Sequence, residues 1–444
     1  MKRMAEIVKK EGAPWVLFLA FVFFSMVSMP VARMALLASL VTMLSCKEGR
    51  RQLKITSPTA GWLAYLALAI VVSSVAAVAL DDPLLVPRKG LGKLTKLLWF
   101  AAIPVCAAQV NSAERFRKVL AALAIGGAVM AVFVLFGHTS FAWLQVHYPA
   151  PGGEAGAPAL AEAIRRAAVT LRLDGAIRRA LADEVWAPWG GRPPCFLYAL
   201  TFNATLHNAQ RLMVALLAAT ALAFCPGKSP TRRASSLIIP VLAAAALVVT
   251  CKRGPLAAGI ISLGLMIAFL SRPWKALVAV VAICLLAVAV PQSRARLQML
   301  PQEFSAKSSN GRALMWTYIA PRLHHEHPWG IGFRSLTPEK MKSIKSRVEP
   351  NRTHFHCSPL QAFIDFGWLG LAVWFAWMAL SFRAAARTAC GIGTTPSALP
   401  RPMRILPLAA FAALFIVSLV EYNIADAAVV LLYGTILGLS ETTA

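Results

Sequence analysis

Long apolar runs separated by short basic segments make up most of the chain. A helix needs about 20 mainly apolar residues to cross a bilayer, and about twelve runs approach that length. They occupy residues 14–30, 31–46, 59–80, 95–111, 119–137, 199–225, 236–251, 254–271, 276–291, 359–380, 405–420 and 424–440. The pattern therefore predicts an all-α fold, a polytopic membrane helix bundle of about twelve transmembrane helices, with residues 1–444 forming a single integral membrane domain.

Two long polar stretches interrupt this pattern. Residues 138–198 carry the pairs Arg165-Arg166 and Arg178-Arg179 in short amphipathic patterns, typical of helices that lie in the membrane interface or pack over a bundle. Residues 292–358 hold 11 lysines and arginines against four glutamates, together with five of the eight histidines. Helix starts are predicted there at Ser309 and Thr337. Both stretches are therefore expected to be folded loops that contain short helices.

Composition agrees with a membrane protein and excludes most soluble classes. Hydrophobic residues make up 58% of the chain and charged residues only 14%, and the formal net charge is +26. In a soluble protein that charge would suggest a nucleic-acid partner. Here the basic residues lie between apolar spans, where membrane orientation and anionic membrane lipid explain them. No nucleic-acid partner is expected.

The distribution of lysine and arginine predicts the orientation of the bundle. With the N-terminus inside, the inner segments hold 20 of these residues, so the positive-inside rule places both termini in the cytoplasm and both long loops outside. Two features run against this rule. Residues 81–96 are too basic for an outer loop, and Arg33 lies near the outer end of a span.

Three ionisable residues lie inside or at the edge of predicted spans, namely Arg211, Arg253 and Asp365. A charge in a bilayer is expensive, so each is a functional candidate. Structural alternatives stay open for all three. Asp365 can pair with an arginine, Arg253 can anchor a short outer turn, and Arg211 can extend its long side chain towards an interface.

His356 is a candidate general base. It lies two residues before Ser358, which together with Pro359 marks a helix start. The positive end of that helix disfavours imidazolium, so we expect a neutral ring that accepts a proton. A ring that only hydrogen-bonds loop backbone is the structural alternative. His354 lies two positions earlier and would share the same face of an extended segment.

Metal and cofactor chemistry are not expected. The tract His324-His325-Glu326-His327 lacks the HExxH spacing, and the six aspartates form no DxD pattern. The chain has neither a P-loop nor a GxGxxG motif, so an enzyme with this sequence needs a substrate that is already activated. The eight cysteines form no CxxC pair and are expected to act as small apolar residues. Cys195 and Cys357 both lie near predicted outer loops, where a disulfide is an open alternative.

Several motifs between about residues 200 and 375 resemble the O-antigen ligase family, part of a wider ligase and polymerase superfamily. The family has Thr-x-Ser-Arg-Gly, His-Pro-(apolar)-Gly-(apolar)-Gly, and His-x-His-Asn-x-x-Leu-Gln followed by Glu/Asp-x-Gly-x-x-Gly. The similar segments here are Thr250-Cys251-Lys252-Arg253-Gly254, Asn310-Gly311-Arg312 with Trp316, His327-Pro328-Trp329-Gly330-Ile331-Gly332, His354-Phe355-His356-Cys357 leading to Leu360-Gln361, and Asp365-Phe366-Gly367-Trp368-Leu369-Gly370. Cys251-Lys252 and Cys357 depart from the family pattern, which has serine before the arginine and asparagine after the second histidine.

The resemblance implies an enzyme of the bacterial inner membrane with its active site facing the periplasm. It would transfer a glycan from an undecaprenyl-diphosphate-linked donor to a lipid A-core acceptor, without a metal or cofactor. His356 would be the catalytic base. Three arginines would bind the diphosphate, and four further residues would support the site. The arginines are Arg211, Arg253 and Arg312, and the supporting residues are Trp316, His354, Gln361 and Asp365.

Other functions share parts of this pattern. An O-antigen polymerase joins two lipid-linked glycans by similar chemistry, and a protein oligosaccharyltransferase is a third reading. A transporter or flippase with an Arg/His cavity belongs to a different class. Transporters usually show paired broken helices in two related halves, and the loops at 138–198 and 292–358 show no such symmetry.

The predicted orientation can be tested by labelling single cysteines from outside the cell. We expect Ser308→Cys to be labelled, because residue 308 lies in a predicted outer loop, and Ser229→Cys to be protected inside. The reverse labelling pattern would overturn the orientation and any mechanism that depends on an outer active site.

Overall fold

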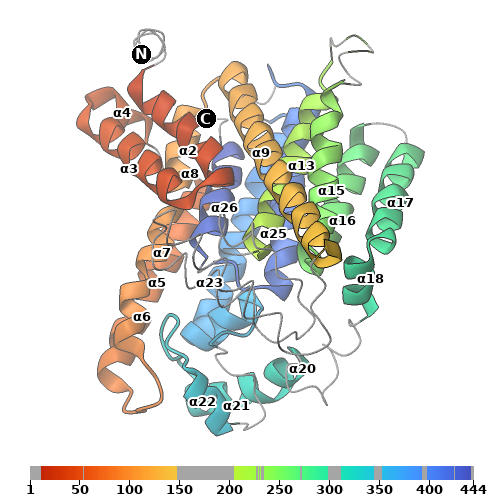
Figure 1. The fold of residues 1–444 in the computed structure, drawn as a ribbon. Helices are drawn as coiled ribbons and strands as arrows, with labels where there is room; N and C mark the ends of the chain where they lie inside the picture. Colours follow the sequence, from red (N-terminus) through yellow and green to blue (C-terminus); the bar gives the residue numbers. More distant parts are fainter. Residues whose placement is uncertain are drawn as a thin grey trace, which may run out of the picture.

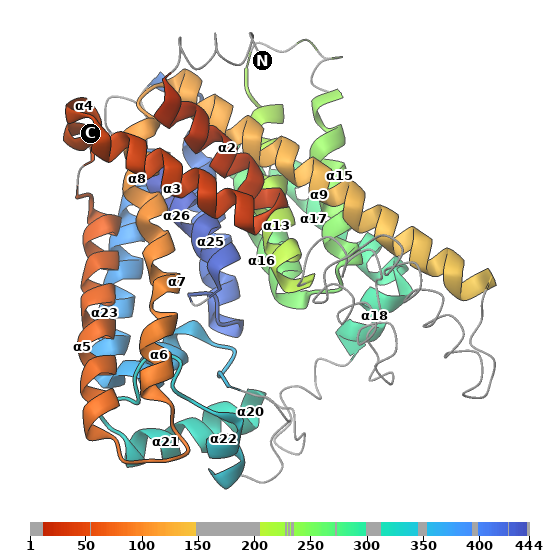
Figure 2. The same cartoon turned by 60° about the vertical axis from the view of Figure 1, so that its left-hand side comes forward.

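The computed structural model describes residues 12–53, 55–147, 205–226, 229, 231, 235–270, 273–298, 312–344, 353–392, 398–424 and 426–441. Every regular element within these ranges is a helix, which confirms the predicted all-α fold. Figures 1 and 2 show the longer helices gathered into one bundle, with several short helices at one end.

Six helical segments of the described chain are long and apolar enough to cross a membrane. They are α5 (Ser57–Ala79), the segment Pro87–Gln109, the Ala113–Leu135 part of α9 (Ala113–His147), α16 (Arg253–Leu270), α23 (Ser358–Ala389) and α25 (Arg401–Val420). The segment Pro87–Gln109 joins α6 (Pro87–Lys93), α7 (Thr95–Leu98), the 3₁₀ turn η1 (Trp99–Ala101) and α8 (Ala102–Gln109).

The remaining helices are shorter or more polar. They are α2 (Ala13–Val27), α3 (Met29–Ser45), α4 (Lys47–Gln52), α13 (Thr205–Ala223), α15 (Ile238–Val249), α17 (Pro273–Ala289), α18 (Pro291–Gln298), α20 (Arg312–Leu314), η2 (Met315–Ile319), α21 (Ala320–Glu326), α22 (Pro338–Ile344) and α26 (Ala427–Leu439).

The structure therefore supports a multi-pass membrane protein, while several predicted spans are shorter than a full crossing. The predicted spans 14–30 and 31–46, for example, correspond to the short helices α2 and α3, which are separated at Ser28, where the backbone is extended (φ −143°). In the other direction, α9 continues to His147, into residues predicted as loop. The rest of the 138–198 loop lies outside the described residues.

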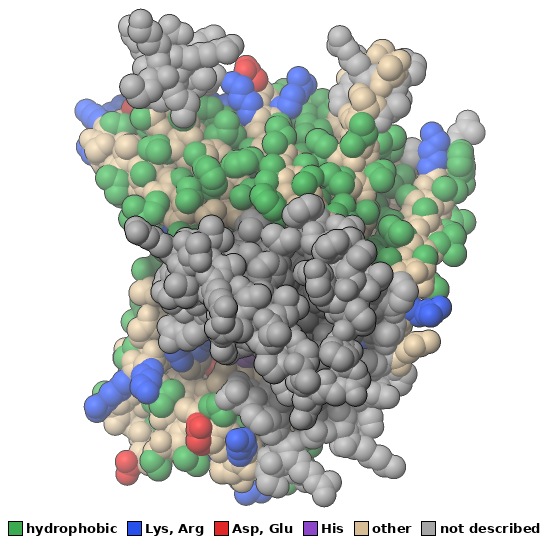
Figure 3. All heavy atoms as spheres, viewed as in Figure 1, with side chains coloured by type: hydrophobic (Ala, Val, Ile, Leu, Met, Phe, Trp, Pro, Cys, Tyr) green, Lys and Arg blue, Asp and Glu red, His purple; other side chains and the backbone are tan. Residues whose placement is uncertain are grey.

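Helix α25 lies at the centre of the bundle. It packs against α13, α16, α23 and α26, and its inward side chains form part of a continuous apolar core. Figure 2 shows α25 and α26 between the α5–α23 pair and the α13–α16 group. On the described part of the face in Figure 3, hydrophobic side chains form a band with lysine and arginine side chains at its edges. This is the surface expected of a membrane protein.

The short helices form a cap at one end of the bundle, whereas the start of α2 and the end of α26 lie at the other end (Figure 1). The cap consists of the nearly continuous run α20–η2–α21, of which η2 is π-helical, and of α22. It has a small apolar core of its own that includes Ile319, Leu323 and Phe355. The predicted second helix of this loop does begin after Thr337, whereas the predicted cap at Ser309 lies outside the described residues.

Two glycine-containing segments, the turn at residues 330–332 and the break in α23 at Gly367, join the cap to α23. The helix is broken at Gly367 (φ 65°, ψ −161°), and the carbonyls just before the break accept hydrogen bonds from Ile331 N–H (3.1 Å, at Ile364) and Gly332 N–H (2.9 Å, at Asp365). A Cβ on Gly330 would lie 2.4 Å from the Asp365 carbonyl oxygen, so only glycine fits there. Backbone N–H groups of the segment at residues 327–332 therefore donate to the carbonyl groups that precede the glycine break in α23.

A lysine between two carboxylates holds α22 in the cap. Lys340 is 8% exposed, and its Nζ lies 2.8 Å from Asp82 Oδ2 and 2.7 Å from Glu326 Oε2. Burial acts to raise the pKa of Asp82, but hydrogen bonding and the Lys340 charge lower it below its ordinary value. The hydrogen bond from Lys340 likewise lowers the pKa of Glu326. Burial acts to lower the pKa of Lys340, and its two hydrogen bonds raise it overall.

We expect Lys340→Met to loosen the cap, because it leaves two partly buried carboxylates without their cation. The loss should be about 1–3 kcal/mol of local stability, seen as faster hydrogen exchange across α22. Lys342→Met is the matched control, since Lys342 is exposed on the same short helix. Equal exchange in the two variants would contradict the role of Lys340.

The same cluster predicts how cap stability depends on pH. A carboxyl group with a lowered folded pKa contributes stability that is lost as the pH falls through that pKa. Asp82 and Glu326 should therefore hold the cap at neutral pH and release it only below about pH 4. The raised pKa of Lys340 keeps its contribution up to at least about pH 10.

Candidate functional site

The loop before α23 carries the two candidate histidines. His356 has a positive φ of 49°, and its Nδ1 lies 3.0 Å from Glu421 Oε2. The His354 and His356 rings lie side by side, with centroids 4.3 Å apart, as their two-residue spacing predicted. The predicted helix start is confirmed to within one residue, because Cys357 is the N-cap and Ser358 the first helical residue.

Ser358 does not cap the helix as predicted. Its Oγ instead donates to the Glu421 carbonyl (3.0 Å) and accepts from the Asn423 N–H (3.1 Å). The hydroxyl therefore fastens the start of α23 to the turn between α25 and α26. The alternative in which His356 bonds only loop backbone is wrong, because its partner is a carboxylate from a distant part of the chain.

Glu421 joins the histidine to an arginine. Its Oε1 accepts from Arg312 Nη2 at 2.9 Å, while its Oε2 faces His356, and the Glu421 side chain is only 13% exposed. Burial acts to raise the pKa of Glu421, but the hydrogen bond with His356 and the charges of Arg312 and His356 lower it below its ordinary value. The group is therefore a carboxylate at neutral pH.

Glu421 begins a short polar segment, which we call the polar turn (Glu421, Tyr422, Asn423 and Asp426). Its residues contact the cap, the loop before α23, α23 itself and α13. The Tyr422 hydroxyl lies 3.5 Å from Asp365 Oδ2, Asn423 Oδ1 accepts from Gln210 Nε2 at 3.0 Å, and Asp426 pairs with His207. The polar turn is thus the point at which the site is assembled.

The polar turn was not predicted from the sequence as part of the site. Residues 421–423 were expected only to join the last two apolar runs. A usable signal was present, because the chain has only 19 acidic residues and one of them begins this polar triplet at the very edge of a span.

Arg211 lies deep in the bundle. It is 3% exposed, its Nη1 lies 3.4 Å from Asn208 Oδ1, and its Nε and Nη2 have no hydrogen-bond partner within the described chain. The alternative in which Arg211 extends to an interface is therefore wrong. A buried guanidinium with unused donors is suited to an anion.

Arg253 begins α16 on the same side of the bundle as the polar turn. A Cβ added at the following residue, Gly254, would meet Val420 Cγ2 at 3.2 Å, and Val420 directly precedes Glu421. The structure therefore brings the start of α16 against the end of α25, where Arg312 and His356 meet Glu421.

The supporting residues fix the loop that carries the histidines. Phe355 N–H donates to Gln361 Oε1 (3.0 Å), and Gln361 Nε2 donates to Asp365 Oδ1 (2.8 Å). Trp316 Nε1 donates to the Phe355 carbonyl at 2.8 Å. Asp365 also accepts from the Arg334 backbone N–H at 3.3 Å. Asp365 therefore continues a hydrogen-bonded chain that starts at the loop beside His356.

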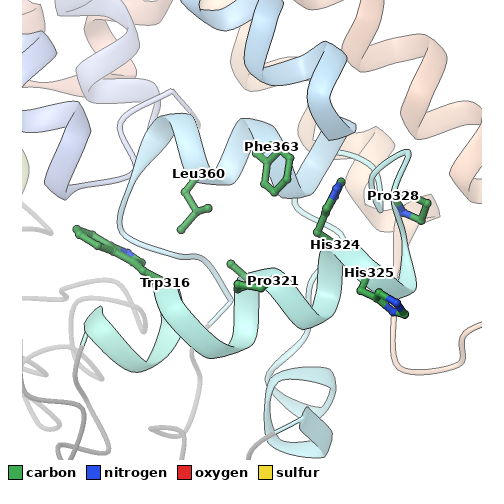
Figure 4. A pocket seen from close by; sticks show the side chains of 8 residues that line it. Trp316, Pro321, His324, His325, Pro328, Leu360 and Phe363 are labelled. Atoms are coloured by element: carbon green, nitrogen blue, oxygen red, sulfur yellow. The ribbon is translucent and has the colours of Figure 1, made fainter.

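An apolar cavity of about 500 Å³ adjoins this centre. Figure 4 shows it between α20–η2–α21 and the first turns of α23, with Trp316 at one end and His324 at the other. The cavity is lined by Trp316, Ala320, Pro321, His324, His325, Pro328, Leu360 and Phe363. Trp316 lines the cavity and also donates a hydrogen bond to the loop before His356, so this residue connects the cavity to the charged centre.

The His324–His327 tract does not converge on one point. The His324 ring lies tilted against Phe363 with centroids 4.1 Å apart, and His327 Nε2 lies 3.8 Å from Asp82 Oδ2. Among the described residues, no three histidine, cysteine, aspartate or glutamate side chains are grouped as metal ligands. Cys195, one half of the alternative disulfide, lies outside the described residues.

We expect Glu421→Gln to loosen the loop at 353–357. It leaves Arg312 without its carboxylate and weakens the bond to His356, and loss of a charged hydrogen bond is worth about 1–3 kcal/mol. Local hydrogen exchange in this loop should therefore be at least about fivefold faster. Glu339→Gln removes an exposed carboxylate from the cap and serves as control. Unchanged exchange in Glu421→Gln would show that the loop is held by other contacts.

One comparison with known proteins bears on this site. Residues 238–375 match the family model described as O-antigen ligase, and this segment contains Arg253, Arg312 and the loop with His354 and His356. No curated protein matches the chain. The family match covers α16, the cap and the first part of α23, the elements that meet at the polar turn. Over this segment, the chain is similar to the O-antigen ligase family.

Proposed function

We propose that this protein is a glycosyltransferase that joins an undecaprenyl-diphosphate-linked O-antigen glycan to lipid A-core. The observation that carries the proposal is the contact of His356 and Arg312 with one carboxylate, Glu421. It combines a group able to accept a proton with a group able to bind a diphosphate. The family match, which is to O-antigen ligase, supports the same substrate class.

His356 is the proposed base. Its Nδ1 is engaged with Glu421, so the other ring nitrogen, Nε2, is available to the substrate. In the proposed reaction, Nε2 removes the proton from an acceptor hydroxyl as that oxygen attacks the anomeric carbon of the donor glycan. Glu421 then stabilises the imidazolium that forms, in the same way that a buried carboxylate orients and stabilises a catalytic histidine in hydrolases.

The arginines are the proposed diphosphate site. As the new glycosidic bond forms, the bond from the anomeric carbon to the diphosphate oxygen breaks and its electron pair leaves with the lipid diphosphate. Arg312, Arg253 and the buried Arg211 offer guanidinium donors for that developing charge. In this scheme the guanidinium groups supply the electrostatic stabilisation, so the reaction requires no metal or cofactor.

The same arrangement supports the proposed location of the site. The cap and the polar turn lie at the end of the bundle opposite the start of α2 and the end of α26 (Figure 1). With the termini in the cytoplasm, as the basic residues indicate, this end faces the periplasm of an inner-membrane protein. An O-antigen polymerase is the nearest alternative, because it uses the same donor and the same chemistry with a second lipid-linked glycan as acceptor.

The proposal predicts unequal roles for the two histidines. With the full-length protein in lipid nanodiscs, undecaprenyl-diphosphate-linked oligosaccharide and lipid A-core, His356→Ala should lower turnover by at least about 10²-fold, the usual worth of a general base. Donor binding should persist. His354→Ala should cost much less, because the described contact with Glu421 is made by His356.

Three outcomes would change the assignment. If His354 is essential and His356 dispensable, the base lies two residues upstream. If the wild-type protein extends a lipid-linked glycan and ignores lipid A-core, the enzyme is a polymerase. If it moves the donor across a bilayer without forming a new bond, the transport reading replaces both.

A further inference from the structure

Four cations form a row that reaches the polar turn. They are Arg33 near the start of α3, Lys93 at the end of α6, Lys96 in α7, and Arg334 in the turn that follows Gly332. We call them the inner cation row. Two of its regions, Arg33 and residues 81–96, are those that conflicted with the positive-inside rule.

Contacts and electrostatic interactions connect the members of this row. Lys93 Nζ donates to the Arg334 carbonyl at 3.1 Å, and the Arg334 guanidinium lies 5.9 Å from the centre of the Tyr422 ring. Lys96 is within electrostatic range of Arg334, Lys93 and Arg33. The Arg33 guanidinium lies 5.3 Å from the centre of the Trp99 ring, three residues after Lys96. The row therefore extends from the membrane hairpin α2–α3 to the polar turn.

These cations are placed where positive charge is costly. Lys93 and Lys96 lie inside the apolar segment Pro87–Gln109, and both are half-buried, as is Arg33. Within the part of the chain that the structure describes, Arg33, Lys93 and Lys96 have no carboxylate within 4.0 Å, and Arg33 Nε is buried without a hydrogen-bond partner. Charge of this kind inside a membrane protein points to a ligand.

Neighbouring residues show that the placement is specific. Arg88 and Lys89 belong to the same short helix as Lys93, but both are exposed. Lys340, the buried lysine of the cap, has two carboxylate partners at 2.8 and 2.7 Å. The inner cation row instead has two carboxylates in electrostatic range. They are Asp365, which acts on Lys93 and Arg334, and Asp426, which acts on Lys96 and is already paired with His207. Four cations thus share two carboxylates, which leaves the row with an excess of positive charge. The helix α7 and the turn η1, beside the row, pack against α26.

We propose that the inner cation row binds a phosphate group of a lipid headgroup. Multiple lysine and arginine donors at a half-buried position suit a phosphate, with its charge and several acceptor oxygens. This inference rests on the proposed function, which requires two lipid substrates at one site. Arg312 and His356 contact Glu421, whereas the inner cation row reaches the polar turn through Arg334, whose guanidinium lies over the Tyr422 ring. The two groups of cations give each phosphate-bearing substrate a separate anchor.

The test measures lipid binding to the full-length protein in nanodiscs, so that it does not depend on turnover. The probes are undecaprenyl-diphosphate-linked oligosaccharide, lipid A-core, and lipid A-core from which a phosphatase has removed the phosphates. The variant is Lys93→Gln/Lys96→Gln. Its matched control, Arg88→Gln/Lys89→Gln, removes the same charge from exposed positions of the neighbouring sequence.

We expect the Lys93→Gln/Lys96→Gln variant to bind one phosphate-bearing lipid at least about tenfold more weakly, the worth of one charged hydrogen bond. The control should bind as wild type. The lipid whose affinity falls identifies the source of the phosphate, and dephosphorylated lipid A-core should not distinguish the variants. Lys93→Arg/Lys96→Arg keeps both charges and should bind as wild type, which tests the proposal even if the glutamine variant fails to fold.

Two results would overturn the inner cation row as a site. One is wild-type affinity of the folded glutamine variant for both phosphate-bearing lipids. The other is an equal loss in the control, which would show only an effect of net charge. Phosphate-selective binding without glycan transfer would uphold the site and reject the proposed function, whereas glycan transfer with unaltered binding in the variant would do the reverse.

Discussion

The organisation of this protein depends on a single carboxylate at the end of its central helix. Glu421 lies at the end of α25 and engages Arg312 from the cap and His356 from the loop before α23. These partners are 109 and 65 residues away in sequence. A buried cation or imidazole needs such a partner, since an uncompensated charge removed from water is strongly unfavourable. The carboxylate thereby determines where three separate segments of the chain meet.

The sequence allowed the helical class, the membrane setting and the main histidine and arginine candidates to be predicted, because these depend on local composition and short motifs. The start of α23 next to His356 also followed from local capping chemistry. Glu421 did not, because its importance comes from contacts between distant segments, which hydropathy does not report. The sequence left the burial of Arg211 open for the same reason, since only the packing of α13 against its neighbours removes that side chain from the interface.

The polar turn also explains how a mainly apolar bundle accommodates so many polar groups. Tyr422, Asn423 and Asp426 contact Asp365, Gln210 and His207, so polar side chains from α23 and α13 find partners at one level of the bundle. Gathering them at one level leaves the remainder of α25 free to pack as an apolar core. A substrate bound there would therefore meet pre-oriented polar groups on more than one side.

The glycine contact between the cap and α23 has a mechanical consequence. The break at Gly367 resembles a hinge, yet the carbonyls of Ile364 and Asp365 are hydrogen-bonded to the 331–332 turn. Both carbonyls precede Gly367, so the cap and the first turns of α23 form one unit, and a bend at Gly367 would move that unit as a whole without breaking these bonds. A displacement of this unit would instead break the contacts of His356 and Ser358 with Glu421. The contacts that assemble the site therefore also restrain the movement of the cap and of the first turns of α23.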